Sequence, residues 1–201
     1  MNQNNRQKTA EQNLTPALLC SAYSQGYFPM PDENTGEILW YRPDPRAVLP
    51  LDSFHVSRSL QSVIKRGFFT VTYNEAFADV IKACSNRETT WITEEFIRSY
   101  TELHRLGSAQ SVEVWYQGEL CGGCYGVNFG GAFFAESMFH TVSNSSKVAL
   151  FYLVRRLKEK NFVLLECQFL TPHLKSLGAV EISDLSYIQE LRRALQVVRT
   201  F

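Results

Sequence analysis

Apolar and polar residues follow helical spacing near the start of the chain and then give way to short extended segments. Thr15 and Pro16 are typical of a helix start, and apolar residues follow at helical spacing until Gly26. "YFPMPDENTG" predicts a proline-containing loop and "EILWY" a strand. "RPDPRAVLP" predicts an irregular segment, because proline cannot donate to a strand ladder.

The next part of the chain predicts three helices and one strand. "SRSLQSVIKRG" has the pattern of a basic helix, and "FFTVTY" that of a strand. Asn74 and Thr93 are each expected to cap a helix whose apolar residues recur every three or four positions. Gly107 is expected to end the second of these.

The pattern then becomes that of a β-meander. "SVEVWYQGELCGGCYGVNFGGAFFAESMF" alternates between apolar and polar positions and contains turn glycines. A helix is expected to start at Ser145 or Ser146, a strand to cover 162–168, and Ser186 with Gln189 to form a capping box for a last helix. This order predicts an α+β fold with a mostly antiparallel sheet.

The chain length of 201 residues suits one large domain or two small ones. We expect a mobile polar tail over 1–13, a small N-terminal α/β domain over 14–55 and a larger domain over 56–201. The apolar fraction of 45% is enough for a core. Twenty basic and twenty acidic residues cancel, so the net charge does not indicate a nucleic-acid partner, although a local basic patch can exist.

Sequence features also bear on location. No apolar run is long enough to span a bilayer, and "MNQNNRQKTAEQN" lacks the apolar core of a signal peptide. Five cysteines, an odd number, favour reduced thiols, so we expect a cytoplasmic protein with no membrane partner. Cys121 and Cys124 form a CxxC without a second ligand pair, which favours small core residues over a zinc or redox site.

Two carboxylates lie in apolar strands, Glu136 in "FFAESMF" and Glu166 in "LLECQ". Such a pair can supply a proton acceptor and an orienting group. The alternative for each is a buried Arg, Lys or backbone amide partner. Gln168 lies two residues after Glu166, so on an extended strand both side chains point to one face, where an amide can hold a carbonyl or an amine.

Other polar residues give weaker indications. Ser137 and the pair Ser145 and Lys147 raise the idea of a Ser-Lys nucleophile, but capping and backbone bonding are favoured. No two of the four histidines have metal-ligand spacing, so no metal site is expected. Trp91 is either a core residue or a ring on which a nucleotide base stacks.

Several segments, in order, carry a resemblance to a known family. They are "AYSQGYFP", "ILWYRPDPRAVLPLDSFHVSRSL", "TWITEEFIRSYTELHRLG", "SVEVWYQGELCGGCYGV", "FFAESMF", "NSSKVAL" and "LLECQFLTPHLKSLGA". Each is weak alone, but the ordered set, covering about Thr15 to Ile182, resembles the leucyl/phenylalanyl-tRNA–protein transferase family.

The resemblance implies a C-terminal domain with a GNAT acetyltransferase-like fold. It also implies that Leu or Phe moves from its tRNA to the N-terminal Arg or Lys of a protein, which creates a degradation signal of the N-degron pathway. The implied partners are aminoacyl-tRNA and such acceptor proteins, and the chain is expected to be a monomer. No metal or cofactor is implied, because the tRNA ester carries the activation.

The resemblance also implies roles for residues. Glu166 and Gln168 would orient or deprotonate the acceptor amine, and Glu136 would bind the aminoacyl group or the amine. The other implied positions form three groups: an apolar pocket for the Leu or Phe side chain, aromatic positions for the terminal adenosine, and a tRNA phosphate patch whose alternative is a solvated helix face. The pocket residues are Cys124, Val127, Phe134 and Met138. The adenosine positions are Trp91 and Met30, and the phosphate patch is Arg58, Lys65 and Arg66.

Three residues depart from the family pattern. Glu166 stands where the family has Asp, Met30 where it has Trp, and Cys124 where a pocket Met is typical. These changes give a longer carboxylate, remove a stacking ring and enlarge the pocket. Two alternatives therefore stay open: a transferase of altered specificity, and a member that binds tRNA or N-degrons without catalysis. An acyl-CoA-dependent N-acyltransferase ranks lower, because "NSSKVAL" lacks a glycine-rich phosphate loop.

Overall fold

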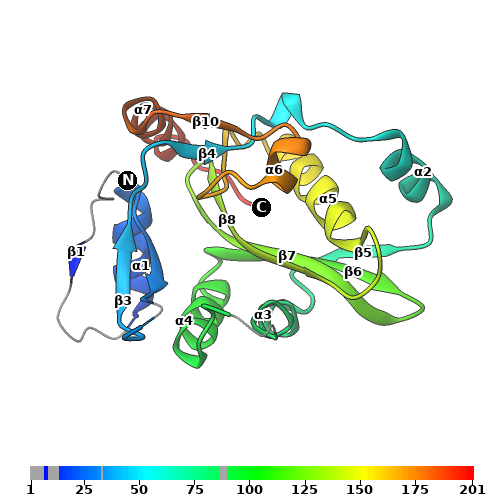
Figure 1. Cartoon of the computed structure of the whole chain (residues 1–201), viewed down its shortest axis with the longest axis horizontal. Coiled ribbons are helices and arrows are strands. Elements are labelled where there is room, and N and C mark those ends of the chain that lie inside the picture. The colour runs from blue at the N-terminus through cyan, green and yellow to red at the C-terminus, as the bar shows by residue number, and fades with distance from the viewer. Residues whose placement is uncertain (1–6, 9–13, 33, 87–89) are drawn as a thin grey trace.

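The computed structural model describes residues 7–8, 14–32, 34–86 and 90–201, and it contains two β-sheets (Figure 1). A three-stranded sheet has the order β1-β3-β2, and a seven-stranded sheet has the order β10-β4-β9-β8-β7-β6-β5. Of the predicted tail 1–13, only Gln7–Lys8 is described; it forms β1 and pairs with β3, and the rest lies outside the described residues.

The small sheet packs beside helix α1, Pro16–Ser24. Its start is as predicted: the Thr15 side chain accepts a hydrogen bond from the Leu18 N–H at 3.3 Å. The predicted loop after this helix is wrong in part, because Phe28–Pro31 forms strand β2, antiparallel to β3, Ile38–Tyr41. β2 lies at the sheet edge, where a proline without an N–H is tolerated.

The large sheet is antiparallel except between β8 and β9, which run parallel. The predicted α+β fold with a mostly antiparallel sheet is therefore confirmed. In sheet order its strands are β10 (Val180–Ile182), β4 (Arg46–Val48), β9 (Leu164–Glu166), β8 (Ala132–His140), β7 (Glu119–Phe129), β6 (Ala109–Tyr116) and β5 (Thr70–Tyr73).

Strand β4 was predicted to be irregular and to belong to the small N-terminal domain. It pairs instead with β9 and β10 inside the large sheet. The prolines of "RPDPRAVLP" flank the strand and none lies within it, so the ladder is not interrupted. Arg46–Val48 therefore joins the large sheet although it lies within the range 14–55.

Helices cover both faces of the large sheet. In Figure 1, α3 (Phe77–Ser85) and α4 (Glu94–Arg105) lie below β6–β8, and α5 (Ser145–Glu159) lies above them. One core forms between α1, α3, α4 and the lower face, and a second between α5 and the upper face. The remaining helices are the 3-10 helix η1 (Leu51–Ser53), α2 (Arg58–Arg66), α6 (Pro172–Ser176) and α7 (Asp184–Leu195).

Helix starts were predicted with mixed success. Thr93 occupies the cap position of α4 without a side-chain cap bond, and α5 begins at Ser145 as expected. Asn74 caps no helix. Its side-chain oxygen accepts from the Ser111 N–H at 2.9 Å and its side-chain nitrogen donates to the Gln110 side chain at 2.7 Å, which ties the end of β5 to β6. The capping box proposed at Ser186 was one turn late, because Ser183 caps α7.

Cys121 and Cys124 both lie on β7 and are buried in the core against α5, and all five cysteines are free thiols. The interpretation of the CxxC as core residues is confirmed. Within the described part of the chain, no helix is long and apolar enough to cross a membrane. The same residues contain no cluster of three or more His, Cys, Asp or Glu side chains suited to a metal ion.

Candidate active site

A β-bulge sets the position of Glu136. Tyr125 pairs with Ser137 and Gly126 with Ala135, so Glu136 is an extra residue of β8 that opposes no residue of β7. A side chain at position 126 would meet the Phe134 carbonyl at 2.2 Å, so glycine permits this close crossing. Bulges bend a strand and redirect its side chains, and here Glu136 turns toward helices α1 and α4.

Glu136 is held by hydroxyl and amide donors. Tyr23 from α1 donates to Oε1 at 2.6 Å, Gln168 Nε2 donates to Oε2 at 3.2 Å, and Tyr100 from α4 donates to Oε2 at 3.5 Å. The two tyrosine hydroxyls lie 2.5 Å apart. No described cation pairs with Glu136, so the alternative of a buried basic partner does not hold for this carboxylate.

Burial changes the proton affinity of this cluster. It raises the pKa of Glu136 to about 8, against the hydrogen bonds from Tyr23, Gln168 and Tyr100, and the charge of Glu166 adds to the rise. Burial also raises the pKa of Tyr23 and of Tyr100 well above the ordinary value, so both hydroxyls stay protonated. Glu136 is therefore a carboxyl group that exchanges its proton near neutral pH.

Glu166 is in a different environment. It is fully buried, and its Oε1 accepts hydrogen bonds from Arg46 Nε at 2.7 Å and from Gln168 N–H at 2.5 Å. Arg46 is also fully buried; it donates to the Gly26 carbonyl at 2.8 Å and lies over the Tyr187 ring. Burial raises the pKa of Glu166 and the Arg46 charge opposes that rise. For this carboxylate the buried-Arg alternative is confirmed.

Strand β9 ends at Glu166, so the expectation that Glu166 and Gln168 share a strand face was wrong. Gln168 has φ 63°, a left-handed conformation, and its side chain reaches across to Glu136. The Glu166 carboxylate bonds the Gln168 backbone, so it holds this turn in place.

A cavity of about 360 Å³ lies beside Glu136 and Gln168. Its walls bring together six of the residues proposed from the sequence, together with apolar residues of α5. The six are Met30, Trp91, Cys124, Glu136, Met138 and Gln168.

The other proposed site residues lie elsewhere. Val127 and Phe134 are fully buried in the lower core and do not line this cavity. Glu166 lies behind it, paired with Arg46. Arg58, Lys65 and Arg66 are exposed on α2 and do not line it either.

Sequence analysis missed four residues of this region: Tyr23, Tyr100, Arg46 and Phe169. The first three carry contacts between elements far apart in the chain, which local patterns do not report. Arg46 did leave a signal, a lone basic residue before the apolar run "AVL". Phe169 lines the cavity with 42% of its surface exposed, an unusual setting for a phenylalanine.

Comparison with solved structures gives only weak similarities. A ribosomal-protein-alanine N-acetyltransferase from Brucella melitensis is 11% identical, with a TM-score of 0.40 over 54% of this chain and 86% of that one. An aminoglycoside acetyltransferase from an uncultured soil sample is 9% identical, with a TM-score of 0.43 over 65% of this chain and 89% of that one.

Comparison with known sequences is much stronger. The model of the leucyl/phenylalanyl-tRNA protein transferase family matches residues 48–192, and that of the family's N-terminal domain matches residues 12–44. Leucyl/phenylalanyl-tRNA–protein transferases from Salinibacter ruber and Gloeobacter violaceus are 52% and 53% identical, over 92% and 90% of this chain and 82% and 94% of theirs. One from Herpetosiphon aurantiacus is 51% identical over 94% of this chain and 98% of its own. The chain belongs to the leucyl/phenylalanyl-tRNA–protein transferase family.

Proposed function

We propose that the cavity beside Glu136 joins Leu or Phe, delivered as aminoacyl-tRNA, to the N-terminal Arg or Lys of a protein. Family membership supports the transferase activity. The observation that supports this location is a carboxyl group with a pKa of about 8 at the wall of an otherwise largely apolar cavity. A monomeric, cytoplasmic enzyme is part of the same proposal.

The reaction needs an unprotonated amine at the ester carbon. The α-amine nitrogen forms a bond to that carbon, the ester C–O bond breaks, the amine loses a proton and the ribose oxygen gains one. An ionised Glu136 accepts the amine proton or holds the ammonium before it is lost. Gln168 donates to Glu136 through Nε2, which leaves its carbonyl oxygen to accept from an amine N–H.

Glu166 acts in this proposal as a positioning residue. Its carboxylate is fully buried and holds the Gln168 backbone N–H and the Arg46 guanidinium. The side chain is one methylene longer than the family's Asp, yet it still forms both contacts. It reaches the substrate only through the Gln168 side chain that it helps to orient.

The apolar half of the cavity is the proposed site for the Leu or Phe side chain. Cys124 and Met138 pair across β7 and β8, and Leu150 and Leu153 of α5 complete this wall. The terminal adenosine is proposed to stack between Trp91 and Phe169, with Met30 beside them. The Phe169 ring supplies an exposed aromatic face near the position where the family's tryptophan is replaced by Met30.

The exposed basic side chains Arg58, Lys65 and Arg66 are proposed to contact phosphates of the tRNA body. α2 lies at the far end of the molecule from the small sheet (Figure 1), so such contacts would involve parts of the tRNA away from its aminoacylated end. This attraction would weaken with salt.

The direct test is transfer of radiolabelled Leu and Phe from charged tRNA to peptides that begin with Arg, Lys, Asp, Glu or Met. Labelled peptide only with Arg and Lys is the expected result, and ribonuclease treatment of the donor should abolish it. Transfer to another N-terminus would replace the proposed acceptor. Binding of charged tRNA without transfer to any peptide would make the chain a binding protein instead.

A Cys124→Met variant is expected to favour Leu over Phe relative to the unchanged chain. The longer side chain would fill part of the 360 Å³ cavity and penalise the larger ring more. The ratio of kcat/KM for Phe-tRNA to that for Leu-tRNA should fall by about tenfold, within the range that small volume changes in an apolar pocket produce. Cys84→Ser, a buried thiol in the other core, is the control, and an unchanged ratio in Cys124→Met would remove Cys124 from the pocket.

A further inference from the structure

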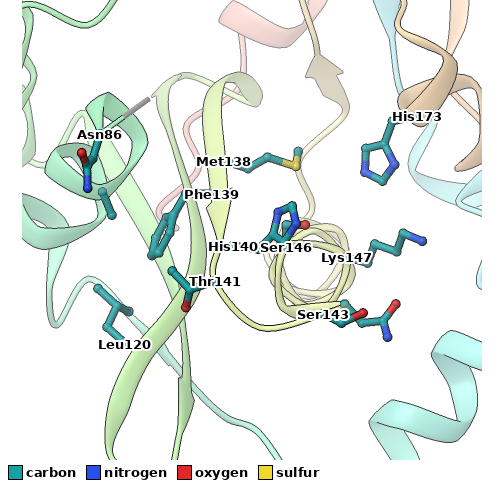
Figure 2. A pocket seen from close by; sticks show the side chains of 12 residues that line it. Asn86, Leu120, Met138, Phe139, His140, Thr141, Ser143, Ser146, Lys147 and His173 are labelled. Carbon is teal, nitrogen blue, oxygen red and sulfur yellow. The ribbon is translucent and has the colours of Figure 1, made fainter. Parts of the chain in front are cut away.

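A second, larger cavity of about 890 Å³ adjoins the first and lies around the N-terminus of α5 (Figure 2). Met138 and His173 line both cavities, so the two are continuous along the wall formed by β8 and α6. Figure 2 shows Lys147 of α5 and His173 of α6 on the same side of the cavity. The proposed transfer reaction uses only the smaller cavity.

Basic side chains line the second cavity. Its lining includes Lys147, His140 and His173, and no Asp or Glu is among the described residues that line it. Lys147 forms no ion pair with any described residue. The Nε2 atom of His173 is buried without a hydrogen-bond partner in the described part of the chain. Burial, and then the neighbouring Lys147 and His140, lower the pKa of His173, and an anion bound beside these groups would oppose that effect.

Hydrogen-bond donors at the start of α5 also face this cavity. Ser146 is only 8% exposed, its side chain lines the cavity, and it bonds no described residue. Its hydroxyl lines the cavity and can donate to a ligand there. The backbone N–H groups of Ser146 and Lys147 also have no acceptor among the described residues, and Asn144 provides no side-chain cap. These groups open a helix of 15 residues, whose dipole favours an anion there.

We propose that this second cavity binds the phosphodiester groups that join the last nucleotides of the tRNA, through Ser146, Lys147 and the first N–H groups of α5. The inference rests on the proposed function, because it places the aminoacyl-adenosine end in the smaller cavity. The chain of nucleotides then continues past Met138 and His173 into the larger one. It gives the enzyme a contact that distinguishes an RNA donor from a free aminoacyl ester.

The diphosphate of an acyl-CoA has related chemistry, but the loop before α5 fits it less well. Compact diphosphate cradles use glycines so that the backbone can approach closely. The segment "TVSNSSK" before and into α5 contains none. The basic groups come from β8, α5 and α6 and surround a wide cavity, which suits phosphates spaced along a nucleic-acid strand.

The test compares two Phe donors, full Phe-tRNA and 3′-O-phenylalanyl adenosine, which has no phosphate. In Lys147→Ala the KM for Phe-tRNA should rise about tenfold, as loss of a charge-assisted phosphate contact predicts. The plot of log KM against log salt should become shallower by about 0.7. The kinetics with phenylalanyl adenosine should be unchanged. Ser146→Ala should show the same pattern to a smaller extent.

Two comparison variants sharpen this result. Lys160→Ala removes the same charge at the opposite end of α5 and should leave both donors unaffected. Phe169→Ala removes the proposed adenosine ring and should weaken both donors alike. Equal losses with the two donors in Lys147→Ala, or no change with Phe-tRNA, would overturn the phosphate site.

Direct binding separates this inference from the proposed function. The 3′-terminal RNA trinucleotide of tRNA and adenosine alone are titrated into the unchanged chain and into Lys147→Ala, with acetyl-CoA as a third ligand. Trinucleotide affinity that depends on Lys147, with adenosine affinity that does not, supports the site even if transfer fails. Lys147-dependent binding of acetyl-CoA without binding of the trinucleotide would overturn it.

Discussion

An Arg46→Met variant is expected to lose about 3–5 kcal/mol of unfolding free energy, because it leaves a fully buried carboxylate without its cation. Arg46 joins three parts of the fold. It pairs with Glu166 of β9 at 2.7 Å, donates to the carbonyl of Gly26 after α1, and lies over the rings of Phe28 and Tyr187. Urea unfolding at pH 7, followed by circular dichroism, measures the loss.

Two further variants identify the cause. Adding Glu166→Gln to Arg46→Met removes the unpaired charge but keeps an oxygen for the Gln168 N–H, so it should recover part of the loss. Arg42→Met breaks the pair with Asp184, whose side chains are 27% and 26% exposed, and should cost about 1 kcal/mol or less. If Arg46→Met costs no more than Arg42→Met, the buried pair does not stabilise the junction.

Local patterns predicted much of the fold because most of its elements have strong local signals. Thr15-Pro16 sets the start of α1, and the alternating apolar residues of the meander became β6, β7 and β8. Strands β2 and β4 were missed because prolines in or beside them suggested loops, whereas their sheet partners decided the outcome. An edge position and flanking turns are properties of the assembled sheet, not of the segment.

The candidate pocket was predicted in part for a similar reason. Cys124 and Val127 are three residues apart on one strand, so they face opposite sides of the sheet, and only Cys124 reaches the cavity. Phe134 and Met138 are four apart and would share a face on a regular strand. The bulge at Glu136 separates them, leaving Phe134 in the lower core and Met138 at the cavity.

The partners of the two carboxylates were beyond single-sequence reasoning. Tyr23 lies 113 residues from Glu136, and Arg46 lies 120 residues from Glu166. Residue type and apolar context identified both carboxylates as unusual. Which one keeps an exchangeable proton and which one is locked in an ion pair depends on these distant partners.

A Glu136→Gln variant is expected to lower kcat for transfer by a factor on the order of 100 to 10,000, the usual range for loss of a positioned proton acceptor. Glutamine matches the shape of Glu136 and can still accept from Tyr23, but it neither takes a proton nor holds an ammonium group. KM for Phe-tRNA should change little, because the aminoacyl and phosphate contacts remain. Single-turnover transfer to an Arg peptide measures the chemical step.

The matched control is Glu113→Gln. Glu113 is another fully buried carboxylate, on β6, bonded to the hydroxyls of Thr72 and Ser111 and absent from both cavities. Its replacement should leave kcat close to that of the unchanged chain. If Glu136→Gln and Glu113→Gln gave similar kcat values, the group that takes the amine proton would not be Glu136.

The same substitution is expected to change stability with pH, which tests the raised pKa independently of activity. The pKa of Glu136 rises from an ordinary 4.5 to about 8 in the folded chain, so the neutral carboxyl favours folding. That contribution is complete below about pH 4.5 and is lost as pH rises through about 8. Glu136→Gln keeps a neutral group at every pH, so relative to the unchanged chain it should gain unfolding free energy between pH 5 and pH 9. The gain is on the order of 4 kcal/mol, measured by urea unfolding at both pH values. If the unfolding free energies of the two proteins changed equally with pH, Glu136 would be ionised in the folded chain throughout this range.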